Sequence, residues 1–135
     1  MLPEKQIMAA CKQVIYGGVK KVVRAEYDFS VHGGAASTIS LGLTIPANSI
    51  VTKVLTDERT AMAGGTSAQF KAASTALTAA IALNAFTGVD NHALNGSVDG
   101  IKLAAKSEIK ITLVGTFTAG HIDIFIEYFQ GRPAD

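Results

Sequence analysis

The chain has little cysteine, charge or aromatic content, and each shortage excludes a class of protein. Its 135 residues include one cysteine, Cys11, so no internal disulfide can form and the chain fits a reducing compartment. Tryptophan is absent, which argues weakly against a platform that stacks sugars. The formal net charge is +1, so no basic field exists to attract nucleic acid or a membrane surface.

Charged residues make up 17% of the chain, against roughly 25% in ordinary soluble domains. Two explanations stay open: a partner covers part of the surface, or the surface is rich in Ser, Thr, Asn and Ala. No run of about 20 apolar residues exists, so no membrane span is expected. The first residues lack a basic region followed by an apolar stretch, so no signal peptide is expected either.

Sequence motifs for chemistry are also missing. His32, His92 and His121 lie in or beside predicted turns, and no two of them have the spacing of a metal-binding pair. No G-x-S-x-G nucleophile motif occurs, and residues 64–67 lack the lysine of a phosphate-binding loop. We therefore expect surface histidines, no metal, no cofactor and no enzymatic activity.

The carboxylates lead to the same interpretation. Asp57 and Glu58 end a predicted strand, and Asp123 and Glu127 lie on the polar side of the last predicted strand. A glycosidase requires two acids facing each other across a cleft. Solvated strand faces and turn acids explain this pattern better.

Period-two alternation dominates the C-terminal third of the chain. Residues 108–114 and 121–128 alternate between apolar and polar side chains, which is typical of strands with one buried face. The glycines of the intervening residues 115–120 suit a tight connection, so we predict a terminal hairpin.

Earlier segments follow a similar pattern. Residues 19–31 and 37–45 read as two strands around a Gly-Gly turn, and we predict that they form another hairpin. Residues 49–57 read as a β-branched strand, followed by a loop at 61–66. Weaker strands are predicted at 66–72 and 100–105.

Three segments are harder to assign. Residues 73–85 are predicted to be a short helix or a bulged strand, and residues 88–100 a long polar loop. Residues 1–18 form an arm or short helix, because Ile7, Cys11, Val14 and Ile15 fit one helical face before two glycines.

Seven or eight short strands separated by turns predict a mainly β fold, a jelly-roll-like antiparallel β-sandwich with an N-terminal arm or short helix. The expected organisation is an arm at residues 1–18, a sandwich domain at 19–130 and a polar tail at 131–135. One feature of the last strand points outside the domain. Ile122, Ile124, Ile126 and Tyr128 share one face, yet Phe125 and Phe129 occupy the other, where another part of the chain or another subunit can cover them.

Three stretches together resemble a known family: residues 22–31 before the Gly-Gly turn, residues 43–52, and residues 113–128. In these stretches the chain is similar to the small capsid decoration, or cement, proteins of tailed bacteriophages, among them the cement protein of a Bordetella phage. The resemblance covers about residues 19–129 and implies a jelly-roll-like sandwich, made in the host cytoplasm, on the exterior of the capsid. It implies the major capsid protein and a second or third copy of the chain as partners, and no active site.

Exposure and apolar character suggest the residues that make these contacts. The candidates lie in the N-terminal arm, in the predicted loop and on the outer side of the last strand: Ile7, Val14, Ile15, Tyr16, Asn91, His92, Leu94, Phe125 and Phe129. Two alternatives stay open, namely another virion part such as a tail or fibre component, and a small enzyme or carbohydrate-binding sandwich.

Overall fold

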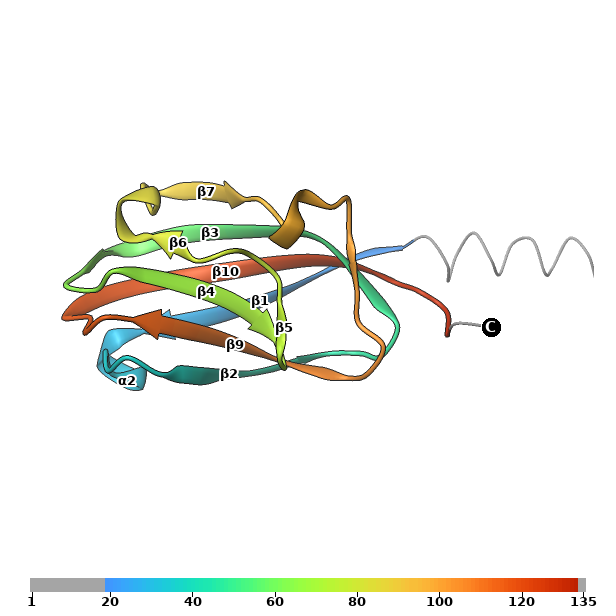
Figure 1. Ribbon diagram of the computed structural model, residues 1–135, viewed down its shortest axis with the longest axis horizontal. Coiled ribbons are helices and arrows are strands. Elements are labelled where there is room, and N and C mark those ends of the chain that lie inside the picture. Colours follow the sequence, from blue (N-terminus) through green and yellow to red (C-terminus); the bar gives the residue numbers. More distant parts are fainter. Residues whose placement is uncertain (1–18, 134–135) are drawn as a thin grey trace, which may run out of the picture.

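The computed structural model describes residues 19–133, which form two antiparallel sheets packed face to face (Figure 1). Sheet A has the strand order β1-β10-β3-β7, with β8 also paired to β3. Sheet B has the order β2-β9-β4-β5, with β6 also paired to β4. The elements are β1 (Lys20–Asp28), α2 (Phe29–His32), β2 (Thr38–Ile45), β3 (Ser49–Ala63), β4 (Ser67–Ala72), β5 (Thr75–Ala76), β6 (Ile81–Ala82), η1 (Leu83–Ala85), β7 (Val89–His92), η2 (Asn95–Ser97), β8 (Ile101–Lys102), β9 (Ser107–Val114) and β10 (Ala119–Gln130).

The core lies between the two sheets and follows the alternation of the sequence. In β9 every second side chain is buried, and in β10 the four apolar residues predicted to share a face all point inward. Each fully buried aliphatic side chain contributes about 1.5–3 kcal/mol relative to exposure. The largest fully buried side chains come from both sheets and from the loops after β5 and β9: Tyr27, Phe70, Phe117, Ile45, Leu77, Ile109, Ile111, Leu113, Ile122, Ile124, Ile126 and Val51.

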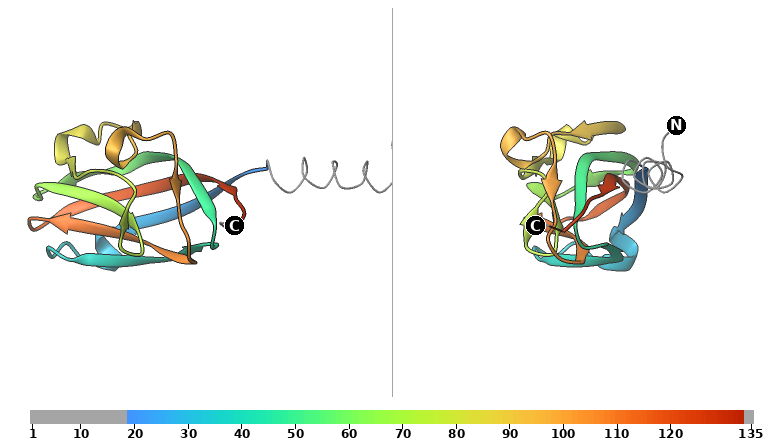
Figure 2. Two further views of the ribbon diagram at one scale, coloured as in Figure 1. Left: turned by 45° about the vertical axis from the view of Figure 1, so that its right-hand side comes forward. Right: turned by 90° about the vertical axis from the view of Figure 1, so that its right-hand side faces the viewer.

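The predicted fold class, a mainly β, jelly-roll-like antiparallel sandwich, is confirmed. The end-on view in Figure 2 shows the strands of the two sheets enclosing the core. β1 begins and β10 ends at the same end of the sandwich, because these strands pair antiparallel from Lys20–Phe129 to Asp28–His121. Among the described residues, no helix has the length and apolar character needed to cross a membrane.

The predicted C-terminal hairpin is wrong. β9 pairs with β2 and β4 in sheet B, whereas β10 pairs with β1 and β3 in sheet A. The segment between them carries the chain from one sheet to the other and buries Phe117, whose N–H donates to the carbonyl of Gly34 at 2.7 Å. The two strands were correctly predicted, but their pairing depends on strands far away in the sequence.

The predicted hairpin of residues 19–31 and 37–45 is also wrong, because β1 and β2 lie in different sheets. The first strand ends at Asp28, where the carboxylate accepts a hydrogen bond from the N–H of Ser30 at 3.0 Å and caps the single helical turn α2. The turn ends at Gly33, whose φ of 76° suits glycine. As a result Val31, which would share the inward face of Tyr27 if the strand continued to residue 31, is exposed.

Three middle segments differ from their predictions. Residues 73–85 form neither a helix nor one bulged strand, but the two-residue strands β5 and β6 and the 3-10 turn η1. The predicted loop at 88–100 contains β7, which pairs with β3 at the edge of sheet A. β3 itself continues through Ala63 into the predicted loop at 61–66. The predicted arm at residues 1–18 lies outside the described residues.

Candidate partner-binding face

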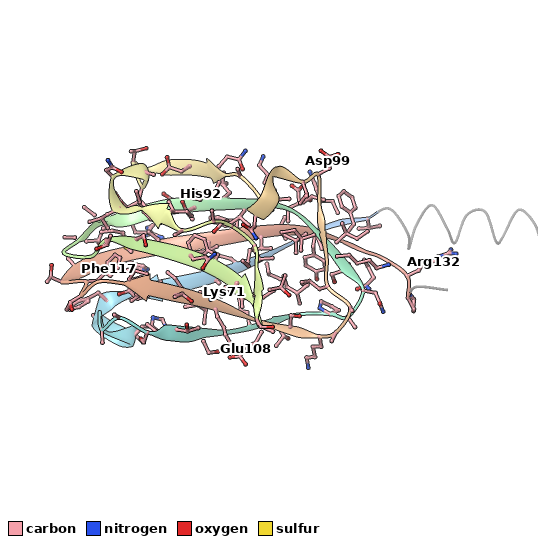
Figure 3. The ribbon with its side chains drawn as sticks, viewed as in Figure 1. Lys71, His92, Asp99, Glu108, Phe117 and Arg132 are labelled. Carbon is pink, nitrogen blue, oxygen red and sulfur yellow. The ribbon has the colours of Figure 1, made fainter. Side chains whose placement is uncertain are left out.

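The outer surfaces of the two sheets have different characters. On sheet B the outward side chains are mainly polar and bond to one another, as the hydroxyls of Thr38 and Thr112 do at 2.9 Å. Ser40 also donates to the Glu108 carboxylate across β2 and β9. Figure 3 shows Lys71 and Glu108, which belong to β4 and β9 of this sheet. Val114, 48% exposed, is a bulky apolar exception near the end of β9.

The outer surface of sheet A carries an apolar strip, defined here as Val22, Leu55 and Phe125. The strand register produces it, because Phe125 of β10 lies opposite Leu55 of β3, and Val22 of β1 lies one outward position away, opposite Glu127. Val22 is 54% exposed, and the other two side chains are partly exposed.

The apolar strip is hollowed rather than flat. A depression of about 210 Å³ is lined by its three members together with Lys53 and Glu127. Glu127 is held in place by the hydroxyl of Thr52, which donates to Oε1 at 3.0 Å, and by Lys20 Nζ, 3.6 Å from Oε2. The apolar strip therefore has an ordered charged border, an arrangement that suits a partner surface more than a solvent surface.

A polar cluster lies further along the same outer surface. Nε2 of His121 is 2.9 Å from Oε1 of Glu26, and a guanidinium nitrogen of Arg59 is 3.2 Å from Oδ2 of Asp123. Asp123 is buried, with 3% of its surface exposed, whereas Arg59 is more than half exposed. The interpretation of Asp123 as a solvated strand acid is therefore wrong, because its side chain is buried and its carboxylate contacts Arg59.

Three of the predicted contact residues lie on this outer surface. Asn91 of β7 is exposed and lies opposite Leu55, so it extends the row that contains Phe125. Phe129 is partly exposed and pairs with Lys20 on one side and Ile50 on the other. The structure thus brings Asn91, Phe125 and Phe129 onto one face, although they come from two strands that do not pair with each other.

His92 and Leu94 point the other way. Nε2 of His92 lies 2.7 Å from the hydroxyl of the buried Thr56, and its ring packs against the rings of Phe70 and Phe86, with centroid distances of 6.2 and 5.4 Å. Burial lowers the pKa of His92 below its ordinary value, and nearby Asp90 opposes the shift. Leu94 is part of the core, so neither side chain offers much surface to a partner. Figure 3 shows His92 in its place on β7.

The remaining predicted contacts, Ile7, Val14, Ile15 and Tyr16, lie outside the described residues. Sequence reasoning missed Val22, Leu55 and the grouping of Glu26 with His121. In the alternation, Val23 falls on the core-facing side of the strand, so its neighbour Val22 falls on the side that is otherwise polar. Glu26 and His121 are 95 residues apart in the sequence, and only the pairing of β1 with β10 brings them together.

A second hollow, of about 520 Å³, opens beside the end of β3 and the turn η1. Among its lining residues Glu58 is the one titratable side chain, and its carboxylate accepts a long hydrogen bond from the N–H of Met62 at 3.3 Å. This lining does not supply the acid–base pair that hydrolytic chemistry requires.

The fold is similar to that of solved structures, whereas the sequence matches no known family. No protein-family model matches the sequence, and no curated protein matches it. Among solved structures, the chain is similar to a chain in the acid-stable capsid of the Helicobacter pylori bacteriophage KHP30, with 12% identity, a TM-score of 0.60, and coverage of 87% of this chain and 91% of that one.

Two further chains give the same result. One belongs to the capsid of the Ralstonia phage GP4, with 16% identity, a TM-score of 0.62, and coverage of 86% of this chain and 87% of the other. Another belongs to the capsid asymmetric unit of the cyanophage Pam1, with 14% identity, a TM-score of 0.57, and coverage of 84% and 86%. At these identities the likeness establishes a shared fold: the chain has the β-sandwich of chains found in three phage capsids.

Proposed function

We propose that the protein is a structural component of a bacteriophage virion. It binds the outer surface of the capsid shell and cements contacts between subunits of the major capsid protein. The main support for this proposal is the fold. The protein shares its fold, over most of its length, with chains from three phage capsids. Such a role depends on surface contacts and requires no bond-breaking centre.

The outer surface of sheet A supports the proposal and supplies the docking face. The apolar strip would be covered on binding, and covering apolar surface contributes about 25 cal/mol per Å². The charged border of Lys53, Lys20 and Glu127 would fix the orientation of the partner. Sheet B, with its mainly polar outer side, would face away from the shell.

The stabilisation of the shell would come from many copies of the protein bound side by side. A single docking face of this size gives a modest affinity, but many copies bound to one lattice act together across the joints between capsid subunits. A self-contact between two or three copies would strengthen this effect, since each copy then anchors its neighbour. We propose such a dimer or trimer as part of the same function.

Co-sedimentation with phage heads tests the proposal. The purified full chain is mixed with empty heads that lack it, from the phage that encodes it, and the heads are pelleted. We expect binding at a fixed ratio to the major capsid protein, and cryo-electron microscopy is expected to locate the chain on the outside of the shell. Absence from the pellet, or density confined to a tail or fibre, would contradict the proposal.

Two matched valine variants test the docking face. Val22 on sheet A and Val114 on sheet B have similar exposure, 54% and 48%, so replacing either with serine removes a comparable apolar side chain. Val22→Ser is expected to weaken binding to heads about fivefold, which corresponds to roughly 1 kcal/mol of lost apolar burial. Val114→Ser is expected to bind like the wild type. Equal effects of the two substitutions would exclude sheet A as the docking face.

A further inference from the structure

Three side chains with metal-ligating atoms converge on the outer surface of sheet A. Glu26, His121 and Asp123 each offer one ligand atom, and these atoms lie within 4.8 Å of one another. Glu26 comes from β1, and the other two come from β10. Two ligands of one tetrahedral zinc ion, with bonds of about 2.0–2.2 Å, lie about 3.5 Å apart, so the more widely separated of these atoms must move inward when an ion binds.

The strand register explains the convergence. Glu26 lies opposite Asp123 in the pairing of β1 with β10, and Asp57 of β3 lies on the other side of Asp123. His121 is two residues from Asp123 on the same strand. The pairing of β10 with β3 shifts register on both sides of His121, and such bulges redirect side chains and are frequent at binding sites.

The cluster is incompletely satisfied by the protein itself. A row of three carboxylates across neighbouring strands is electrostatically unfavourable, and Arg59 pairs with Asp123 alone among them. Nε2 of His121 is buried and has no hydrogen-bond partner among the described residues. Its 2.9 Å distance to Oε1 of Glu26 suits an ion pair when the imidazole is protonated, and it also suits two ligands of one metal ion when the imidazole is neutral.

We propose that this cluster binds one divalent transition-metal ion, with Zn²⁺ as the best fit. The ligands are Nε2 of His121 and one carboxylate oxygen each from Glu26 and Asp123. One imidazole with two carboxylates suits zinc, whereas calcium and magnesium prefer ligand sets made only of oxygen. The site departs from the expectation, drawn from the sequence, that the chain holds no metal.

Arg59 is compatible with this site. Its guanidinium contacts Oδ2 of Asp123, and hydrogen-bonded carboxylate ligands are usual around metals because the outer partner fixes their orientation. Three protein ligands would leave one position of a tetrahedral ion for a ligand from solvent, and the Glu26 side chain is about half exposed.

Calorimetric titration of the full chain with ZnCl₂ tests the proposal, with MgCl₂ as the comparison ion. A Cys11→Ser background removes the thiol as a competing zinc ligand. We expect one Zn²⁺ ion per chain and a rise in the unfolding temperature that grows with zinc concentration, and no effect of Mg²⁺. His121→Gln and Glu26→Gln are each expected to weaken zinc binding at least tenfold. His32→Gln is the matched control, because His32 lies outside the cluster, and it should leave binding unchanged.

Three results would overturn the proposal. The first is no heat and no shift in unfolding temperature at about 1 mM ZnCl₂. The second is zinc binding of equal strength in His121→Gln, which would assign the ion to another place. The third is a zinc-dependent rise in unfolding temperature that is equally large in Glu26→Gln, which would show that Glu26 is not a ligand. Zinc binding at this cluster does not depend on the capsid role, so failure to bind zinc leaves the proposed capsid function intact, and the reverse also holds.

Discussion

Replacing Phe117 with alanine tests the most consequential feature of the fold, the passage of the chain from sheet B to sheet A. Phe117 is 1% exposed and lies at the end of the sandwich, as Figure 3 shows. Its ring rests on Gly65 so closely that an added Cβ there would lie 2.1 Å from a ring carbon. A phenylalanine buried in this way costs about 3–5 kcal/mol of unfolding free energy when it is truncated to alanine.

The alternative arrangement predicts a different value. If residues 115–120 formed the turn of a two-stranded hairpin, Phe117 would be a surface residue and its truncation would change the free energy of unfolding by less than about 0.5 kcal/mol. Thr116→Ala is the matched control, because Thr116 belongs to the same segment and is exposed. We expect this control to remain within about 0.5 kcal/mol of the wild type.

Urea unfolding followed by far-ultraviolet circular dichroism measures these values, since the chain has no tryptophan to serve as a fluorescent probe. Phe117→Leu provides a milder variant if the alanine variant does not fold. A second substitution, Gly65→Ala, should overpack the site and cost about 1–3 kcal/mol in the wild type. Its cost should shrink when Phe117 is alanine, because the new methyl group then enters the vacated space. A small effect of Phe117→Ala, or strictly additive effects of the pair, would refute this description of the crossing.

Two further predictions concern buried polar groups. Tyr27→Phe removes the hydroxyl that donates to the carbonyl of Gly33 at 2.7 Å, and we expect a loss of about 1 kcal/mol in urea unfolding. An unchanged midpoint would show that water replaces this bond at no cost. For His92, burial lowers the pKa below its ordinary 6.5, so below that pH the unfolded chain binds a proton that the folded chain does not. The contribution of neutral, buried His92 to stability is therefore fully present above pH 6.5. It decreases as the pH falls below 6.5, until the lower pKa of the folded state is reached. His92→Gln, which retains a polar group near Thr56, should reduce this pH dependence between about pH 7.5 and 5.5, and an identical slope in both proteins would contradict the assignment.

Among the candidate contacts, sequence reasoning succeeded where a local pattern was sufficient. The alternation of β10 indicated that Phe125 would face outward, because side chains along a strand alternate regardless of which strands lie beside it. It failed for His92, since polarity and glycine content suggested a loop, whereas pairing with β3 turns this ring toward Thr56 and Phe86. The strand beside a short segment determines which of its sides faces the core. Nothing in the sequence of residues 88–100 indicates that β3 lies beside them.

The sequence by itself determined the fold class and the inward and outward sides of the long strands, because both depend on a two-residue period that needs no partner. Only the tertiary structure decided which strands pair. Thr112 and Asp123 lie on successive strands, yet one belongs to sheet B and the other to sheet A. Hydrogen bonds between strands do not depend on side-chain identity, so the same alternation fits a hairpin or a crossing. The burial of Phe117 and the pairing of β10 between β1 and β3 select the crossing, and that pairing assembles both the apolar strip and the Glu26–His121–Asp123 cluster.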